Sequence, residues 1–595
     1  MTIPAEAPRD PWSPRPIDRP TPVAAGAELD GAKIFAAPDD PAEWPRWRED
    51  LVAWRERART GYSGALYDEP AFAWTQSCFS VALVWLWDEL LYDFEGEQFI
   101  PKRFVDAAAQ FGGFDGVVLW HAYPVIGIDD RNQFDWYRDV PGIRELVADL
   151  QAADVRVFVD YNPWDVGTRR EPADDAQVVA NVVAWLGADG VFLDTMKEAP
   201  QALRAALDAI RPGIAFEGES TLPLARVADH HLSWAQWFAD SPVPGVIRAR
   251  WFEQRHMLHH TRRWNRDHAE ELQSSWLNGT GMLVWDVVFG VWVGWNDRDR
   301  GLLRTMVEVQ RRNVDQLTRG EWTPLAARSD DLQVVGSRWR LGDDEVWALA
   351  NRADEPFEGT IDLDGRSLEL TVPARGIAAL EPGDRLTVSP AGLAAAFPAR
   401  PTVRVEPPWA NTPAVPERMV ECPVPGAQTA VFRRRETGTY GDAPYVEEWK
   451  PLPPRLHDLI EVERPQGRGR FAIGVQEVAG ADGHPLTRVT LDEARAYAAE
   501  RGARLPTEDE WQAAAAAGLL ERLEPHVWNW TESEHRDGRT RFAILKGGSH
   551  YEAPGSDWYA DGGERGPEHS LKLLLVGGGL QRSPSIGFRL AVDLP

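Results

Sequence analysis

Short hydrophobic runs alternate with helical patterns between Cys78 and about Arg319. The runs are SVALVWLW, DGVVLWHAYP, VRVFVDYNPWD, DGVFLDTM and GIAFEGES. In PGIRELVADLQAADV and DDAQVVANVVAWLGA, hydrophobic residues recur at helical spacing, and Asp174 or Asp175 is a possible N-cap of the second helix. The runs are continuous and do not alternate with polar residues, which indicates strands buried on both faces of a parallel sheet.

The length of this region, about 250 residues, favours a (β/α)8 TIM barrel. A doubly wound sheet is the alternative, but no glycine-rich phosphate fingerprint follows the early strands. We therefore predict an α/β barrel domain over residues 70–325. Residues 1–69 are assigned to an N-terminal extension that is partly disordered and includes a helix in AEWPRWREDLVAWRERA.

The remainder of the chain changes pattern twice. Short alternating strands such as EVWALANRA predict a small antiparallel β-sandwich over residues 326–395. A proline-rich linker then begins the last unit, residues 396–595, which has many glycine turns and one clear helix in TLDEARAYAAERG. That unit is predicted to be an α+β domain.

Charge and composition narrow the classes of function. With 64 basic and 92 acidic residues, the formal charge of −28 disfavours nucleic acid and anionic membrane surfaces as partners. The sequence has no signal-like or membrane-length hydrophobic stretch and only two cysteines, Cys78 and Cys422, so we expect a reduced cytoplasmic protein. The 28 tryptophans point towards carbohydrate, because indole rings stack on sugars. The oligomeric state is left open.

Polar side chains close successive predicted strands: His121; Asp160 and Asn162; Asp194; Glu217 and Glu219. In a parallel barrel these positions converge on the face that holds the active site. Cleavage of a glycosidic bond needs two carboxyl groups, one ionised and the other protonated. We predict Asp194 as one of them, and Glu217 or Glu219 as the other, since these two lie on one face of their strand.

A simpler interpretation is that Asp194 caps the helix predicted in DTMKEAPQALRAAL, and for this residue alone capping and catalysis are equally supported. Four successive strands ending in ionisable groups, however, are more than capping requires. The residues predicted to bind the substrate are His121, Asp160, Asn162, Trp164, Asp240, Trp285 and Asp286.

Tryptophans and histidines form two further groups. We predict that five tryptophans line the cleft, with core packing as the alternative for each: Trp120, Trp164, Trp285, Trp292 and Trp295. The second group is His256, His259, His260 and His268. Their spacing matches no metal-ligand motif, so we predict a solvated helix face and expect neither a metal nor a cofactor.

The barrel resembles retaining α-glycosidases of the α-amylase and α-galactosidase type, through GVFLDTM at the fourth strand and EVWALANR in the domain that follows. The resemblance implies that Asp194 is the nucleophile. In the amylase type the acid/base ends the next strand, which favours Glu219; in the α-galactosidase type it lies two strands on, which favours Asp240. Phe192 occupies a position where the amylase type usually has arginine.

The last unit resembles the formylglycine-generating enzyme (sulfatase-modifying factor) family, whose fold is related to C-type lectins. The shared motifs are PLTRVTLDEARAYAAERGARLPTEDEWQAAAAAG, VWNWTES, LKGGSHY and SIGFRLA. That family binds copper through two cysteines, whereas no cysteine follows Cys422 here and Leu590 replaces one of them. The related sulfoxide synthases bind iron through histidines of a helical domain that this chain lacks.

These resemblances imply that the last unit is a binding or structural module that helps to shape the glycan cleft. The sequence thus predicts a glycoside hydrolase acting on an oligosaccharide or glycoside. Two alternatives remain: an oxidoreductase that acts through the last domain, and a sugar-binding protein without catalytic activity.

Overall fold

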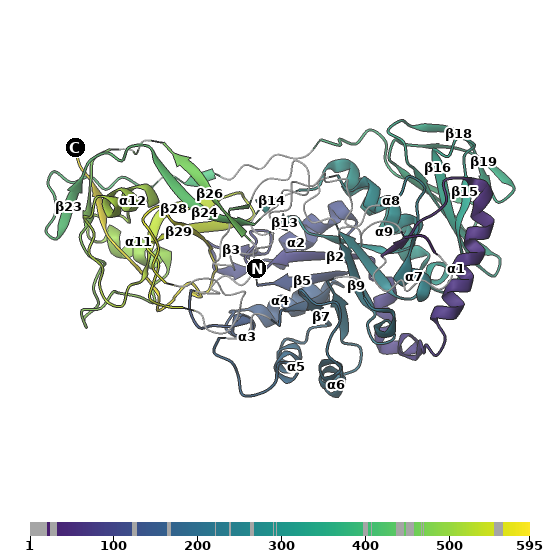
Figure 1. Ribbon diagram of the computed structural model, residues 1–595, viewed down its shortest axis with the longest axis horizontal. Helices are drawn as coiled ribbons and strands as arrows, with labels where there is room; N and C mark the ends of the chain where they lie inside the picture. Colours follow the sequence, from purple (N-terminus) through teal and green to yellow (C-terminus); the bar gives the residue numbers. More distant parts are fainter. Residues whose placement is uncertain are drawn as a thin grey trace.

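The structure is a computed structural model of the 595-residue chain. It describes residues 21–23, 33–121, 128–163, 168–219, 222–236, 240–261, 267–288, 291–292, 294–396, 403–405, 407–435, 446–447, 457–465, 467, 469–552 and 563–595. A barrel lies between a β-sheet domain on one side and the C-terminal domain on the other (Figure 1). Among the helices of these residues, none is both long and apolar enough to cross a membrane.

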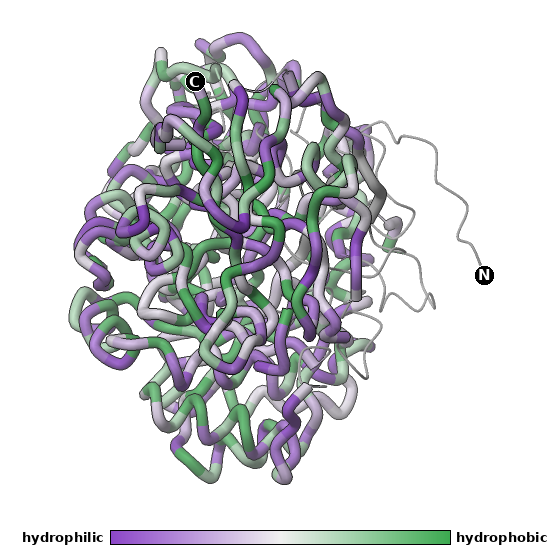
Figure 2. Tube along the Cα trace, turned by 90° about the vertical axis from the view of Figure 1, so that its left-hand side faces the viewer, coloured by the Kyte–Doolittle hydropathy of each residue, from purple (hydrophilic) through white to green (hydrophobic). Residues whose placement is uncertain are grey.

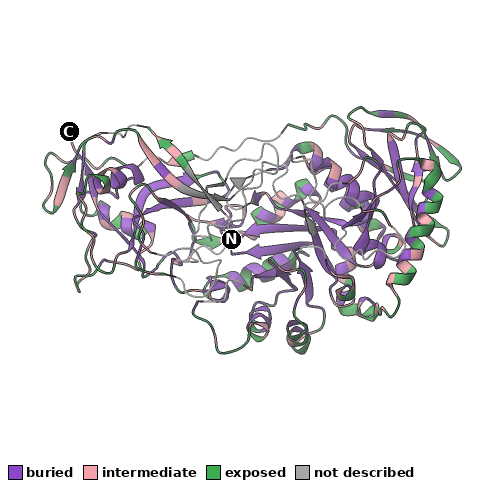
Figure 3. Ribbon diagram, viewed as in Figure 1, coloured by how far each residue is buried: buried purple, intermediate pink, exposed green. Residues whose placement is uncertain are grey.

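Eight parallel strands close into a barrel in the order β11-β12-β2-β5-β6-β7-β8-β9, which confirms the predicted fold. The strands are β2 (Ser80–Trp85), β5 (Gly116–Trp120), β6 (Arg156–Tyr161), β7 (Gly190–Leu193), β8 (Ala215–Gly218), β9 (Leu232–Gln236), β11 (Met257–Thr261) and β12 (Gly281–Val284). In chain order β7 is the fourth barrel strand and β8 is the fifth. The strands are buried, while α1, α5 and α6 expose their outer faces (Figure 3).

Helices cover the barrel and precede it in the chain. They are α1 (Trp44–Ala58), α2 (Pro101–Ala108), α3 (Gln133–Arg138), α4 (Ile143–Ala152), α5 (Asp175–Leu186), α6 (Gln201–Ile210), α7 (Arg248–Phe252), α8 (Ala269–Leu277), α9 (Asp297–Arg312) and α10 (Val314–Arg319). The predicted hydrophobic stripe of α4 is buried, and the predicted N-cap Asp174 accepts a 2.9 Å bond from the Gln177 amide at the start of α5. Helix α1 confirms the helix expected in the N-terminal extension.

Smaller elements complete this part of the chain. Short antiparallel pairs join β1 (Ile34–Phe35) to β10 (Val246–Ile247), β3 (Tyr92–Asp93) to β4 (Gln98–Phe99), and β13 (Val287–Val288) to β14 (Val291–Trp292). The short 3-10 helices are η2 (Pro41–Glu43), η3 (Ala65–Asp68), η4 (Pro70–Ser77), η5 (Ala109–Phe111) and η6 (Leu224–Arg226).

The domain after the barrel is a seven-stranded antiparallel sheet in the order β19-β18-β15-β16-β17-β20-β21. Its strands are β15 (Glu321–Arg328), β16 (Val334–Leu341), β17 (Asp344–Asn351), β18 (Phe357–Leu363), β19 (Arg366–Val372), β20 (Ile377–Glu381) and β21 (Arg385–Val388). It has a hydrophobic core of its own and is bound to α8, where the Trp276 indole donates to the Leu349 carbonyl at 3.0 Å.

The C-terminal domain mixes antiparallel sheets with two helices, α11 (Leu491–Ala499) and α12 (Glu508–Ala516). Its strands are β22 (Val403–Val405), β23 (Met419–Cys422), β24 (Gln428–Arg435), β25 (Val446–Glu447), β26 (His457–Arg464), β27 (Phe471–Gly474), β28 (Trp528–Arg536), β29 (Arg541–Lys546), β30 (Ser570–Leu574), β31 (Ile586–Phe588) and β32 (Ala591–Asp593). Helix α11 is the predicted helix, and Thr490 and Glu493 form its capping box. Figure 2 turns this domain towards the viewer and shows hydrophobic and hydrophilic stretches interleaved along its chain.

The C-terminal domain packs against the end of the barrel at which the strands finish. Arg539, between β28 and β29, contacts Asp88 after β2 at 2.7 Å and Asp286 after β12 at 3.3 Å. The Ser585 hydroxyl donates to the carbonyl of Ile128, in the segment between β5 and α3. Because barrel enzymes hold their sites at this end, the C-terminal domain borders the candidate site.

The histidine group contradicts the prediction of a solvated helix face. His259 and His260 lie on β11, the seventh barrel strand, and His256 and His268 flank it; all four side chains are buried. His256, His259 and His268 make polar contacts; for example, His256 Nε2 lies 2.7 Å from the Ser233 hydroxyl. The prediction failed because a buried polar residue with a partner leaves no hydrophobic signature in the sequence.

Candidate functional site

Asp194 immediately follows β7 at the mouth of the barrel. Its amide continues the strand pairing by donating to the Tyr161 carbonyl at 3.0 Å, and its side chain is partly exposed. The Asn162 side-chain amide donates to Asp194 Oδ2 at 3.1 Å. The N-cap of α6 is Pro200, so Asp194 does not cap that helix, and the capping alternative is wrong. The Asp194 carboxylate instead lies at the carboxyl end of β7.

Glu219 follows the neighbouring strand β8 and is bound to the loop that carries Asp194. The Thr195 amide donates to Glu219 Oε2 at 2.5 Å, and the Glu219 amide donates to the Met196 carbonyl at 3.0 Å. Thr195 has a φ of 63°, a left-handed conformation that costs a non-glycine residue about 1–3 kcal/mol. The two reciprocal bonds hold this strained loop, and with it Asp194, beside Glu219.

Glu217 lies deeper in the barrel. Its side chain is fully buried and contacts His259 Nδ1, while His259 Nε2 donates to the Cys78 carbonyl at 2.7 Å. Burial alone would lower the pKa of His259, but the charge and hydrogen bond of Glu217 outweigh it, and the pKa lies above its usual value. The two residues therefore form an ion pair inside the barrel, below the mouth.

His121 and Asp160 end the neighbouring strands β5 and β6. His121 Nε2 lies 3.6 Å from Asp160 Oδ2, and both side chains are fully buried. The Tyr137 hydroxyl connects these strands, because it donates to the Leu119 carbonyl at 2.8 Å and accepts from the Asp160 amide at 2.6 Å. His121, Asp160, Asn162, Asp194 and Glu219 thus follow one another across four adjacent strands at the same end of the barrel.

Asp240, the alternative acid, is built into the loop after β9. Its Oδ1 accepts from the amides of Ser241 at 2.8 Å and Gly245 at 2.9 Å, and its Oδ2 accepts from the Ser274 hydroxyl at 2.9 Å. Burial raises the pKa of Asp240 despite these bonds and the charge of Arg352. Its carboxylate connects the loop to α8.

Asp286 and Trp285 follow β12. Asp286 Oδ2 accepts from Arg539, and the Trp285 indole is almost wholly buried and donates to the Val287 carbonyl at 2.8 Å. Sequence reasoning missed Asp88 and Arg539. Asp88 comes directly after the hydrophobic run SVALVWLW and could have been found by the strand-end rule, whereas Arg539 lies in a turn of another domain and carried no such signal.

Aromatic rings fill the barrel beneath these strand ends. Ring centroids of successive pairs lie 5.4 Å apart for Trp85–Trp120, 5.6 Å for Trp120–Trp285, 6.3 Å for Trp285–Trp234 and 4.2 Å for Trp234–Phe192. Trp120 is therefore packed within a continuous aromatic layer, as is Trp285.

Two of the other tryptophans predicted to line the cleft cannot be placed. Trp164 lies outside the described residues, and the side chain of Trp292 is not described. Trp295 is 1% exposed and stacks on His268 with ring centroids 3.9 Å apart. The prediction that Trp295 lines the cleft is wrong, because this indole fills the core between His268 and Phe111.

A cavity of about 280 Å³ lies beside β2, β12 and α2, and Asp286, Arg300 and Arg539 contribute its polar lining. None of its lining residues belongs to β7 or β8 or to the loops that follow them. It is therefore separate from Asp194 and Glu219.

Both cysteines are free and buried. Burial raises the pKa of Cys422 to about 11, so its thiolate, the form that binds metals, is disfavoured. Cys78 is enclosed in the barrel, and burial raises its pKa as well. Neither residue offers a soft ligand for copper.

Residues 456–524 match the model of the sulfatase-modifying factor enzyme 1-like domain, which confirms the resemblance for that segment. The formylglycine-generating enzyme of Streptomyces coelicolor is 38% identical over 71 residues, which are 12% of this chain and 21% of that protein. The inactive C-alpha-formylglycine-generating enzyme 2 of Mus musculus is 37% identical over 82 residues, 14% of this chain and 23% of that protein. This chain thus matches only about a fifth of the length of these relatives.

Solved structures similar to this chain include the debranching enzyme of Nostoc punctiforme, with 12% identity and a TM-score of 0.34, covering 51% of this chain and 98% of that one. The maltogenic α-amylase AmyB of Thermotoga neapolitana has 12% identity and a TM-score of 0.35, covering 53% and 99% respectively. Similarity at this level does not identify an activity.

Proposed function

We propose that the barrel cleaves a glycosidic bond in an oligosaccharide or glycoside, with Asp194 as nucleophile and Glu219 as general acid and base. The observation that carries the proposal is the position of the two carboxyl groups at the ends of the fourth and fifth barrel strands. They are linked through the bond from the Thr195 amide to Glu219.

In this mechanism the ionised Asp194 attacks the anomeric carbon and forms a glycosyl ester, while protonated Glu219 gives its proton to the leaving oxygen. Glu219 then takes a proton from a water molecule, which attacks the ester and releases the sugar and the Asp194 carboxylate. The Asn162 amide, 3.1 Å from Asp194 Oδ2, orients the nucleophile.

The contacts of the other carboxylates support this choice. Glu217 is engaged in a buried ion pair with His259, and Asp240 accepts three hydrogen bonds within its own loop and from α8. Asp286 is paired with Arg539. Glu219, by contrast, contacts the Asp194 loop directly.

A screen of aryl α- and β-glycosides and of oligosaccharides, read by NMR of the first product anomer, tests the proposal. We expect cleavage with retention, for which the carboxyl groups must stand about 5–5.5 Å apart. Glu219→Gln should lower turnover by about 10²–10⁴-fold, and less for substrates with activated leaving groups. Equal turnover by wild type and a folded Glu219→Gln variant would contradict the assignment.

Gly218→Ala tests whether close packing of β8 against the loop after β7 positions Asp194. A Cβ at position 218 would stand 2.7 Å from the Lys197 carbonyl oxygen, so the loop after β7 must move away from β8. We expect kcat/KM to fall by about 10²-fold, since displacement by about 1 Å has effects of that size. The matched control is Gly426→Ala, where a Cβ meets nothing within 4 Å and activity should be unchanged. Full activity in Gly218→Ala would show that this contact does not position Asp194.

A further inference from the structure

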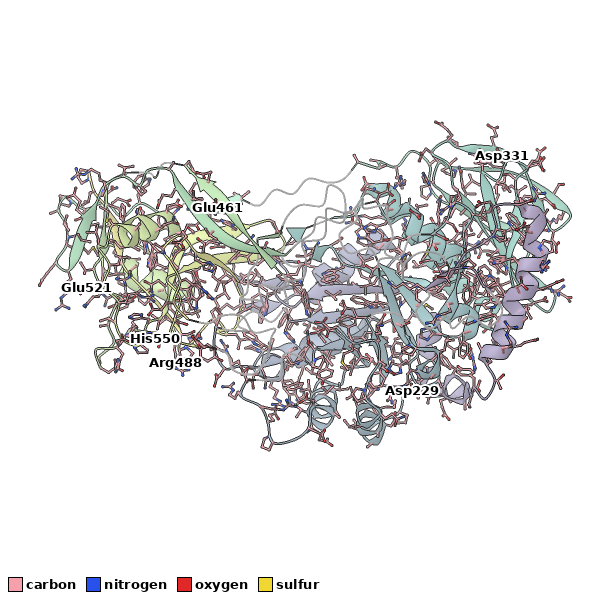
Figure 4. All side chains as sticks on the ribbon, in the orientation of Figure 1. Asp229, Asp331, Glu461, Arg488, Glu521 and His550 are labelled. Atoms are coloured by element: carbon pink, nitrogen blue, oxygen red, sulfur yellow. The ribbon has the colours of Figure 1, made fainter. Side chains whose placement is uncertain are left out.

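Four side chains from three loops meet on the surface of the C-terminal domain. Glu524 and His526 precede β28, His550 follows β29, and Glu564 precedes β30. The loops are tied together through the main chain, because the His550 amide donates to the His526 carbonyl at 2.9 Å and the Ser549 amide to the Gly563 carbonyl at 3.2 Å. His550 lies at the lower edge of this domain in Figure 4. The folded backbone therefore brings the four side chains together.

Each imidazole stands between the two carboxylates. Glu564 Oε1 contacts His526 Nδ1 and lies 3.2 Å from His550 Nε2. The opposite nitrogens face Glu524: His526 Nε2 lies 3.4 Å from its Oε1, and His550 Nδ1 lies 3.3 Å from its Oε2. The rings lie side by side, with their centroids 4.3 Å apart.

The contacts with Glu564 indicate which nitrogen of each ring carries a proton, because a carboxylate oxygen accepts hydrogen bonds and each ring places one nitrogen against Glu564 Oε1. In the neutral rings, His526 Nδ1–H and His550 Nε2–H donate to it, and the lone pairs of His526 Nε2 and His550 Nδ1 then face Glu524. Two nitrogen lone pairs and a carboxylate therefore face one another, and these are atoms that can bind a metal ion.

The spacing fits a particular class of ion. In a tetrahedral zinc site with bonds of about 2.0–2.1 Å, neighbouring ligand atoms lie about 3.3 Å apart. Each nitrogen lies beside a different oxygen of Glu524, at 3.4 Å and 3.3 Å, and one ligand atom from each of the three residues lies within 4.8 Å of the other two. Imidazole and carboxylate are both ligands of zinc, and carboxylates that hold the second nitrogen of ligating histidines are a regular feature of such sites.

We propose that the C-terminal domain binds Zn²⁺ through Glu524, His526 Nε2 and His550 Nδ1, with the fourth position open to water. Glu564 acts as a positioning residue that sets the two tautomers. Zinc can reach the site, because the side chains of His526 and His550 are 20% and 44% exposed. The nearby Arg522 guanidinium donates to the Gly547 and Val527 carbonyls, and the two carboxylates outweigh its single charge. The proposal is independent of the activity assigned to the barrel.

The test is titration of the full chain with Zn²⁺ after dialysis against a chelator, followed by calorimetry and by metal analysis of the dialysed complex. We expect one zinc ion per chain, bound in the full chain and removed by the chelator. His526→Ala, His550→Ala and Glu524→Gln should each abolish stoichiometric binding. Glu564→Gln should keep the ligands but weaken binding by about 10–100-fold.

His484→Ala is the matched control. This exposed imidazole donates to the main-chain carbonyl of Glu524 at 2.7 Å but contributes no ligand, so its loss should leave zinc affinity unchanged. Thermal melting of each variant without metal checks that it is folded. If an alanine variant unfolds, the weaker zinc binding expected of Glu564→Gln, which keeps the size of the side chain, still tests the proposal. Absence of stoichiometric zinc in the wild type, or wild-type affinity in His526→Ala and His550→Ala, would overturn the proposal.

Discussion

Asp194→Asn is expected to abolish glycoside turnover while the barrel stays folded. An amide cannot form the glycosyl ester, so we expect a loss on the order of 10⁴-fold or more, as removal of a nucleophile produces elsewhere. Asparagine still offers an oxygen to the Asn162 amide, 3.1 Å away in the wild type, so the cost in stability should be about 1 kcal/mol or less. Steady-state kinetics and thermal melting measure the two effects separately.

Asp174→Asn is the matched control. Asp174 is a true helix cap, through its bond to the Gln177 amide, and asparagine caps as well as aspartate does. This variant should therefore keep both its activity and its stability. Normal turnover in a folded Asp194→Asn protein would contradict the assignment and direct the search to Asp240 and Asp286.

Arg539→Met is expected to have the largest effect on stability. The guanidinium forms three hydrogen bonds with Asp88, whose side chain is 1% exposed, and a fourth with Asp286. Burial alone would lower the pKa of Arg539, but the charge of Asp88 outweighs it and raises the pKa. Removing one partner of a buried ion pair costs about 3–5 kcal/mol, because the other charge remains buried without compensation.

Because Arg539 joins the C-terminal domain to the barrel, its loss should also make the two domains unfold at different temperatures. Calorimetry should show one transition for the wild type and a split or broadened one for the variant. Arg582→Met is the control: its exposed pair with Glu493 should contribute about 1 kcal/mol or less. If Arg539→Met melted like the wild type in a single transition, the ion pairs would not couple the two domains.

The sequence was sufficient to predict strands where burial on both faces produces a continuous hydrophobic run. Strands β2, β5, β6, β7 and β8 could be predicted because each is buried on both faces and reads as a continuous hydrophobic run. Strands β9 and β11 could not, because they include buried polar residues whose partners lie elsewhere in the barrel. Ser233 contacts His256, and His259 contacts Glu217.

The candidate site could be predicted from the sequence in part, because predicted strands also place the residues at their ends. Asp194 and Glu219 were predictable because parallel strands finish at one end of the barrel. The distinction between Glu217 and Glu219 was not, since it depends on His259 being aligned beside Glu217 by β11. The contact of Arg539 with Asp88 joins two domains far apart in the chain, and no local pattern encodes such a contact.

Trapping the glycosyl–enzyme intermediate tests the central claim most directly. The protein would be treated with an activated fluorosugar matched to the substrate that the screen identifies, then digested and mapped by peptide mass spectrometry. We expect one sugar per chain, esterified to Asp194, and no label in Asp194→Asn. A label on another carboxylate would contradict the account, as would turnover with inversion and no covalent intermediate.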